Sequence, residues 1–127
     1  MSSTARAQVS PERIYQFAWG YSAPLILEAG ISNRVFDVLD QGPKTVAQVA
    51  AATGASERGL TILMNALVGL EFLSKDAEQR YALTPESATF LVSTKPGFQG
   101  GIIKHCSEQL IPKWLQLNRI VATGEPA

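Results

Sequence analysis

Residues 44–84 constrain the fold more than any other part of this 127-residue chain. Thr45 and Gln48 are spaced as a capping box, in which each side chain satisfies a free backbone N–H of the first helical turn. Gly54 is placed to end that helix, because glycine adopts the left-handed conformation at low cost. Ser56 is placed to cap a second helix. The apolar stripe of this second helix recurs at helical spacing and consists of Leu60, Leu63, Met64, Leu67 and Leu70.

Two short strands are predicted after the second helix. Residues 72–74 and 81–84 are mostly apolar and flank the polar loop 75–80. Helix, tight turn, helix and hairpin in this order make a winged helix-turn-helix. We therefore predict a mainly α fold: a winged helix-turn-helix with extra N-terminal and C-terminal helices and a small two-stranded wing. Winged helices read DNA or bind proteins, and the fold alone does not choose between these functions.

The N-terminal part of the chain is rich in aromatic side chains. We expect residues 1–10, which are small and polar, to be flexible and residues 11–127 to form one domain. Ser10, Pro11 and Glu12 are typical of a helix start. This helix and the residues just after it carry Tyr15, Phe17, Trp19 and Tyr21. These rings either pack on the domain's own core or on a second chain, because Tyr and Trp suit interfaces that are partly apolar and partly wet.

A long helix is predicted between the aromatic segment and the capping box. Apolar side chains recur at helical spacing over residues 21–40, and residues 41–43 (Gln-Gly-Pro) end the pattern. Gly30 lies inside this helix, where glycine costs about 1 kcal/mol relative to alanine. We therefore expect a close packing contact at Gly30.

The C-terminal third is predicted to contain two more helices. Residues 85–92 form a short helix, and residues 93–101, which include Pro96 and three glycines, form a flexible loop. Residues 102–121 form the last helix. Pro112 lies within it and is expected to kink it or split it, because proline removes a helical hydrogen bond.

Charge counts mildly against DNA binding. Lys and Arg number 11 and Asp and Glu also number 11, so the formal net charge is zero, whereas nucleic-acid binders usually carry a basic excess. The outer face of the second predicted helix offers Arg58, Thr61 and Asn65 beside Glu57. The predicted wing is also electrically neutral, with Lys75, Arg80, Asp76 and Glu78. A small transcriptional regulator that binds DNA as a dimer stays open as the alternative function.

Cysteine and histidine are too few for a disulfide or a metal cluster. Cys106 is the only cysteine and His105 the only histidine. The sequence has no signal-peptide core and no apolar run long enough to span a membrane. We expect a cytoplasmic protein that binds neither metal nor membrane.

The order of these segments carries a family resemblance. An aromatic helix precedes a long helix that closes with residues 35–39 (Val-Phe-Asp-Val-Leu), and residues 42–50, 67–73 and 80–85 follow in turn. The Trp114 helix and a Thr-Gly-Glu-Pro-Ala ending complete the chain. This order resembles the N-terminal dimerisation domain of S-adenosylmethionine-dependent O-methyltransferases, the group that includes acetylserotonin, caffeate-type and polyketide-tailoring enzymes. The resemblance covers essentially the whole chain.

The resemblance implies a module without catalytic residues of its own. In the family a Rossmann-like catalytic domain follows, so it is expected after Ala127, and it holds S-adenosylmethionine and a small hydroxylated acceptor. The module alone is expected to bind no cofactor, to form a homodimer through its terminal helices and to catalyse nothing. By the resemblance, one subunit's N-terminal element closes part of its partner's acceptor pocket. The candidate residues are Tyr15, Phe17, Trp19 and Tyr21 for that element, and His105, Gln109 and Trp114 for the pocket wall.

Two further points concern a third function and one residue. A free-standing subunit that pairs with a separate catalytic chain is a third possible function. The family also usually has glycine where this chain has Glu71, at the turn that leaves the second helix. A positive φ at Glu71 would therefore carry about 1 kcal/mol of strain.

Overall fold

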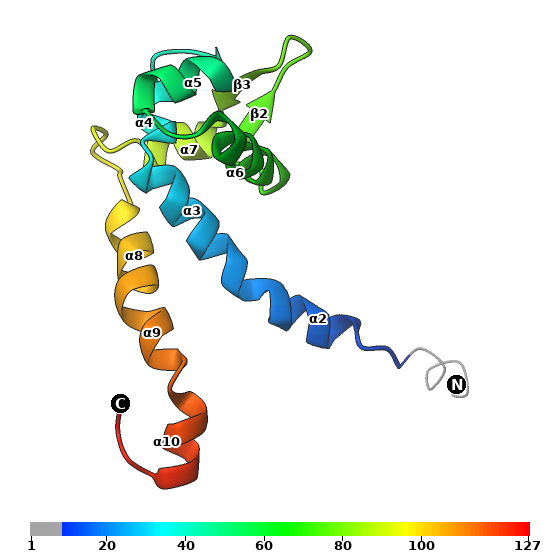
Figure 1. The fold of residues 1–127 in the computed structure, drawn as a ribbon, viewed down its shortest axis with the longest axis vertical. Coiled ribbons are helices and arrows are strands. Elements are labelled where there is room, and N and C mark those ends of the chain that lie inside the picture. Colours follow the sequence, from blue (N-terminus) through cyan, green and yellow to red (C-terminus); the bar gives the residue numbers. More distant parts are fainter. Residues whose placement is uncertain (1–8) are drawn as a thin grey trace.

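The computed structural model describes residues 9–127, and most of them are helical (Figure 1). The expected flexibility of residues 1–8 lies outside the described residues. The N-terminal elements are α2 (Glu12–Ala18), the 3₁₀ turn η1 (Trp19–Tyr21), α3 (Ser22–Ser32) and α4 (Val35–Leu39). The central elements are β1 (Lys44–Thr45), α5 (Val46–Thr53), α6 (Glu57–Gly69), β2 (Leu73–Lys75), β3 (Arg80–Leu83) and α7 (Pro85–Phe90). The C-terminal elements are α8 (Gly100–His105), the π-helical turn η2 (Cys106–Leu110), α9 (Ile111–Trp114) and α10 (Leu117–Thr123).

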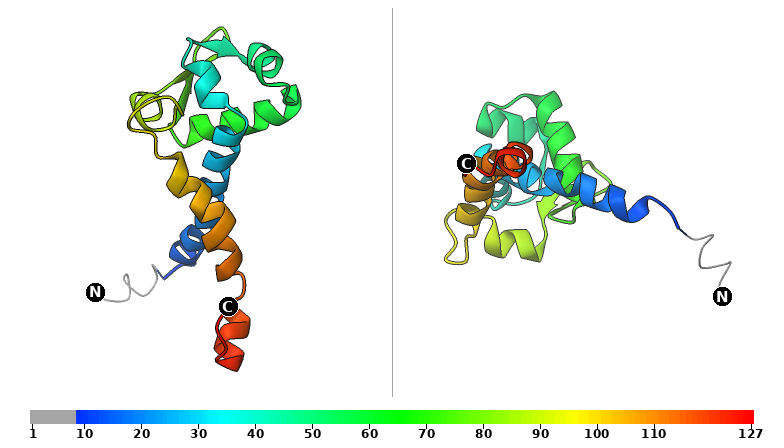
Figure 2. Two further views of the ribbon diagram at one scale, coloured as in Figure 1. Left: turned by 90° about the vertical axis from the view of Figure 1, so that its left-hand side faces the viewer. Right: turned by 90° about the horizontal axis from the view of Figure 1, so that it is seen from below.

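Helices α4 to α7 and the strands form a compact head, from which two helical arms extend (Figures 1 and 2). We call α2, η1 and α3 the N-terminal rod, and α8 to α10 with η2 the C-terminal arm. The rod and the arm contact each other where α3 packs on α8 and η2. The core lies in the head and consists of Val35, Phe36, Val38, Leu39, Val49, Leu60, Met64, Leu67, Leu73, Tyr81, Leu91 and Val92. The N-terminal rod adds to this core from one side, because Ile26, Leu27 and Ile31 of α3 are partly buried against it.

The local helix signals around the turn are confirmed. Thr45 and Gln48 form the predicted capping box, and the Ser56 hydroxyl accepts a hydrogen bond from the backbone N–H of Gly59. Gly54 ends α5 with φ 78°. The apolar stripe of α6 is confirmed at its centre, whereas Leu70 is 37% exposed.

The sheet has three strands rather than the predicted two. Its order is β1-β3-β2 and both pairs are antiparallel, with Lys44 opposite Tyr81 and Leu73 opposite Leu83. Strand β1 escaped prediction because it is two residues long and pairs with a segment far along the chain. The sheet thereby ties the start of α5 to the hairpin that follows α6.

The prediction of one helix over residues 21–40 is wrong. Residues 21 and 22 continue directly from α2 through η1, and the helix ends near Asn33. Arg34 then adopts a left-handed conformation with φ 61°, which separates α3 from α4 and turns α4 into the core. A non-glycine residue in this conformation leaves little trace in the sequence.

The close contact predicted at Gly30 is confirmed. A Cβ added to Gly30 would lie 2.8 Å from Cε2 of Phe36 and 3.3 Å from Cδ1 of Leu67. Gly30 therefore lets α3 rest directly on the Phe36 ring and on α6.

We expect Gly30→Ala to lower the free energy of unfolding by about 1 kcal/mol. The gain in helix propensity is about 1 kcal/mol, but forcing a methyl group into a close-packed site costs about 1–3 kcal/mol. Urea denaturation followed by circular dichroism measures the difference. Gly69→Ala is the matched control, because an added Cβ there meets nothing within 4 Å, and it should leave stability unchanged or raise it. Equal effects at the two glycines would contradict the packing argument.

Glu71 has the positive φ that its position suggested, at 65°. Its N–H donates to the carbonyl of Val68, so the residue is held at the turn between α6 and β2. We expect Glu71→Gly to raise the free energy of unfolding by about 1 kcal/mol, because glycine has no Cβ penalty in this conformation. Glu71→Ala removes the charge but keeps the Cβ, and should give no such gain in the same urea titration.

The hairpin tip is held by one carboxylate. The Asp76 side chain accepts hydrogen bonds from the backbone N–H groups of Glu78 and Arg80, and its Oδ2 lies 2.9 Å from Nε of Arg80. These bonds, with the Arg80 N–H as the largest contribution, lower the pKa of Asp76. These hydrogen bonds therefore stabilise the folded chain fully at pH values above the ordinary Asp pKa. Their contribution is lost below about pH 4, as the pH falls through the lowered pKa of Asp76. We expect Asp76→Asn to flatten the fall of stability in that acid range, as measured by urea titrations at several pH values.

The C-terminal arm is interrupted as Pro112 suggested, but not at Pro112 itself. The π-helical turn η2 precedes Pro112, and the helix breaks afterwards at Leu115 and Gln116. The wider turn accommodates the missing N–H of the proline.

The predicted loop 93–101 ends earlier than expected. Its last two residues belong to helix α8, whose first residue, Gly100, is buried. Among the described residues, no helix is both long and apolar enough to cross a membrane.

Candidate functional site

Large apolar side chains are exposed along both arms. On the N-terminal rod the exposed fractions are 53% for Tyr15, 73% for Phe17, 64% for Trp19 and 61% for Tyr21. Within the described part of the chain, α2 and η1 bury no residue at all. These aromatic side chains therefore do not pack on the chain's own core. The first of the two interpretations drawn from the sequence, packing on that core, does not apply to them.

The aromatic rings at residues 15, 17 and 19, in α2 and at the start of η1, lie on two faces. Tyr15 and Trp19 are stacked, with ring centroids 6.5 Å apart and planes inclined by 27°. Phe17 lies on another face, where the Arg13 guanidinium sits 5.3 Å from its ring centroid. The first face thus presents a continuous aromatic surface, whereas the second is partly covered by a cation.

A groove between α3 and α6 continues the exposed apolar surface of the rod. It encloses about 420 Å³. Its lining is almost entirely apolar: Tyr21, Ser22, Leu25, Ile26, Ala29, Gly59, Ile62, Leu63 and Ala66. Ile62 is 64% exposed although it lies in the middle of α6. The groove escaped prediction because it depends on how α3 and α6 pack, and Ile62 was the one local signal that could have indicated it.

The C-terminal arm carries the other predicted residues. His105 ends α8, Gln109 lies in η2 and Trp114 ends α9, and all three are exposed. The Trp114 ring is 67% exposed. It lines a shallow hollow of about 250 Å³ together with Leu110, Lys113, Leu117, Ile120 and Ala127. The structure therefore places these three residues together on one arm, apart from the aromatic residues of α2.

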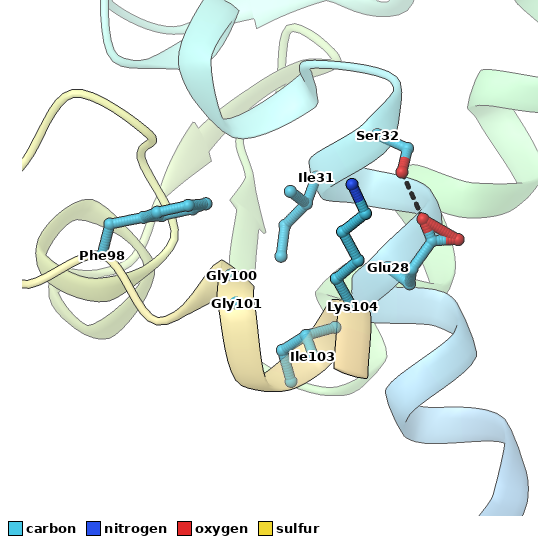
Figure 3. Close-up of a pocket in the computed structure, with 8 residues that line it drawn as sticks. All are labelled: Glu28, Ile31, Ser32, Phe98, Gly100, Gly101, Ile103 and Lys104. Carbon is cyan, nitrogen blue, oxygen red and sulfur yellow. Dashed lines mark hydrogen bonds between the residues drawn. The ribbon is translucent and has the colours of Figure 1, made fainter. Parts of the chain in front are cut away.

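A second cavity lies where α3 meets α8, and the sequence did not indicate it (Figure 3). It encloses about 360 Å³, with apolar walls from Ile31, Phe98 and Ile103 and polar groups from Glu28, Ser32 and Lys104. The Ser32 hydroxyl donates to the Glu28 carboxylate. The ring of Phe98 lies so close to Gly100 that an added Cβ would overlap it. Gly100 is therefore a packing position and not the flexible joint that the sequence suggested.

The cavities and the exposed faces of the arms are mostly apolar. Among residues 9–127, no three His, Cys, Asp or Glu side chains gather closely enough to hold a metal ion. The polar side chains that line the cavities are few: Glu28, Ser32 and Lys104 in the cavity between α3 and α8, and Ser22 in the groove between α3 and α6. Such surfaces suit contact with another apolar surface or with an amphipathic small molecule.

Comparison with known proteins agrees with this geometry. The model of the O-methyltransferase dimerisation domain matches residues 15–93, which include Tyr15, Phe17, Trp19 and Tyr21 and the whole head. Acetylserotonin O-methyltransferase from Mus musculus is 34% identical over 97% of this chain and 33% of its own length. The tetracenomycin polyketide synthesis 8-O-methyl transferase TcmO from Streptomyces glaucescens is 27% identical over 91% of this chain and 34% of its own length.

A solved structure extends the likeness to the C-terminal arm. Human N-acetylserotonin methyltransferase in complex with SAM superposes with a TM-score of 0.81, at 27% identity, over 93% of this chain and 36% of that one. The chain belongs to the O-methyltransferase dimerisation domain family. It spans about a third of the length of the curated relatives that it matches.

Proposed function

We propose that this chain is the dimerisation and pocket-closing module of an S-adenosylmethionine-dependent O-methyltransferase. The observation that carries the proposal is the exposed aromatic surface of the rod, in a chain that belongs to this family. The module binds a second copy through its terminal helices. The parent enzyme, whose catalytic domain follows the module, binds S-adenosylmethionine and transfers its methyl group to a small hydroxylated acceptor.

Burial of the rod supplies the free energy of association. Each aromatic side chain of α2 and η1 removes on the order of 100 Å² from water when it is covered, at about 25 cal/mol per Å². Aromatic residues are also those that carry most of the binding energy in protein interfaces. Helix α2 and the turn η1 bury no residue within the chain itself, so this part of the rod is free to contact a partner.

The residues on the two arms then take different roles in the parent enzyme. Tyr15, Phe17, Trp19 and Tyr21 form the element that reaches the second subunit. The wall of the acceptor pocket is formed by His105, Gln109 and Trp114. Their exposure on the arm supports this role, because a wall residue must be free to contact a ligand.

We further infer that the head is a winged helix-turn-helix that serves protein contact. The order α5, turn, α6 and the hairpin β2–β3 supports this assignment. Two features favour a protein partner over DNA. Ile62 is exposed in the middle of α6, and the hairpin tip pairs Arg80 with Asp76 and Glu78, so its cation is neutralised.

Sedimentation equilibrium of the purified chain tests the proposal. We expect a dimer at micromolar concentrations, and a monomer at every concentration would overturn it. The same sample should transfer no methyl group from S-adenosylmethionine to a phenolic acceptor, and turnover above the blank would contradict the assigned role. A titration with duplex DNA at low salt should be flat, whereas salt-sensitive, sequence-dependent binding would support the regulator instead.

A further inference from the structure

We propose that two carboxylates of α4, those of Asp37 and Asp40, bind the segment 93–99 and thereby fix the position of the C-terminal arm. We call this segment the strap. Asp37 is then a positioning residue for the three side chains of the arm that are assigned to the pocket wall. The inference rests on the proposed function for the role of that wall, and it adds the contacts that set where the wall stands.

Asp37 makes two hydrogen bonds to the start of the strap. Its neighbours in α4 on both sides are buried in the core, whereas the Asp37 side chain reaches the surface. One carboxylate oxygen, Oδ1, accepts from the backbone N–H of Ser93 at 2.7 Å, and Oδ2 accepts from the Ser93 hydroxyl at 2.6 Å. Hydrogen bonds to an ionised group are about twice as strong as neutral ones. These two bonds join residues 56 positions apart, so they are tertiary contacts that tie the strap to the head.

Two further contacts hold the middle and the end of the strap. Asp40 follows Asp37 by three residues, so the two carboxylates lie on neighbouring parts of one helix face. The Oδ1 atom of Asp40 lies 3.4 Å from Nζ of Lys95. The backbone N–H of Gln99 donates to the carbonyl of Phe90, at the end of α7, over 2.8 Å. The strap is therefore bound to the head near its start, at its middle and at its end.

The strap leads directly into the arm. Helix α8 begins at Gly100, immediately after the Gln99 contact, and the arm continues from there (Figure 1). The ring of Phe98 lies against Gly100, so the end of the strap also packs on the first residue of α8. At Gly97 an added Cβ would lie 3.0 Å from the carbonyl oxygen of Thr89, which shows how closely the strap lies on α7. The direction in which α8 leaves the head therefore follows from the position of the strap.

The packing of the arm on the rod leaves room for movement. Helix α8 contacts α3, but the two helices enclose the cavity of about 360 Å³ that Figure 3 shows. Gly100 and Gly101 line it from the arm and present no side chain to α3. Close-packed protein interiors contain few voids larger than a water molecule. The contact with α3 alone is therefore too loose to fix the arm, and the strap supplies the missing constraint.

Amide hydrogen exchange of Asp37→Ala tests whether the strap depends on α4. We expect the Gln99 amide to exchange about tenfold faster or more, because the strap opens more often once its hydrogen bonds to a charged group are lost. The Phe72 amide, which donates to the carbonyl of Leu67 in the head, is the internal control. Its rate should change less than that of Gln99.

Distances between spin labels measure the position of the arm itself. In a Cys106→Ser background, one label is attached at Ala51→Cys in α5 and the other at Lys113→Cys in α9, and both positions are exposed. Labelled chains are mixed with a large excess of unlabelled chains, so that the two labels of one copy dominate the signal. We expect Asp37→Ala to broaden the distance distribution while circular dichroism shows a folded head.

A matched pair of variants at Ser93 isolates the hydroxyl group. Ser93→Thr keeps the hydroxyl, whereas Ser93→Val has nearly the same shape as threonine without it. Ser93 is exposed, so both side chains have space. We expect Ser93→Thr to retain the distance distribution of the unaltered chain and Ser93→Val to broaden it.

The outcomes separate this inference from the proposed function. A folded Asp37→Ala chain with the distance distribution of the unaltered chain overturns the inference, while the proposed function stands. If Asp37→Ala does not fold, the Ser93 pair decides, and equal distributions for Ser93→Thr and Ser93→Val overturn the inference. A chain that sediments as a monomer, but whose arm is released by Asp37→Ala, overturns the proposed function and leaves the hold of α4 on the arm standing.

Discussion

Phe36→Ala is expected to lower the free energy of unfolding by about 3–5 kcal/mol, a large share of the 5–15 kcal/mol typical of a domain. Phe36 is 1% exposed and lies at the junction of the rod and the head, where its ring occupies the space that a Cβ on Gly30 would need. Removing the ring leaves a cavity under α3, and the helix cannot move inward because Leu67 already supports it from α6. The variant therefore loses both transfer free energy and packing contacts.

The choice of probe matters for this measurement. Both tryptophans, Trp19 and Trp114, lie on the arms and are mostly exposed, so circular dichroism reports unfolding of the head better than fluorescence does. Protein concentration must be equal in all samples, because dimerisation shifts apparent stability. Phe90→Ala is the control: its ring is 44% exposed, and we expect a loss of about 1 kcal/mol. If the two substitutions lowered the free energy of unfolding by similar amounts, the ring of Phe36 would contribute no more to core packing than the partly exposed ring of Phe90.

Local signals in the sequence predicted local structure well. Thr45, Gln48, Gly54 and Ser56 act on backbone groups within three or four residues, and each takes the role that its spacing predicted. Long-range geometry was predicted less well. The break at Arg34 depends on how α4 packs into the core, and the pairing of Lys44 with Tyr81 joins segments far apart in the chain.

In the candidate site, too, local features were predicted from the sequence and features that depend on long-range packing were not. The aromatic residues of α2 stood out in the sequence because their density exceeds what a short terminal helix needs. The groove did not, since Ile62 acquires its meaning only when α6 lies beside α3. Gly100 was interpreted as a flexible joint for a similar reason: its role is to receive the ring of Phe98, which a linear sequence does not display.

Trp19→Ala is expected to weaken dimerisation about a thousandfold. A tryptophan at the centre of an interface contributes about 2 kcal/mol or more. A homodimer loses the contribution twice, once from each copy, which gives about 4 kcal/mol, or about three powers of ten in the Kd. The stacked Tyr15 ring also loses its neighbour, so its own contact becomes less well ordered. Sedimentation equilibrium over a wide concentration range measures the change in Kd.

Trp114→Ala separates an effect of the rod from a general effect of removing an exposed tryptophan. Trp19 and Trp114 are the only tryptophans in the chain, and their exposed fractions are similar, at 64% and 67%. Because Trp114 is assigned to the pocket wall and Trp19 to the dimer contact, we expect the Kd to change less than about tenfold for Trp114→Ala. If the two substitutions weaken the dimer equally, the C-terminal arm carries as much of the interface as the rod does. If only Trp114→Ala weakens it, the roles assigned to the two arms are reversed.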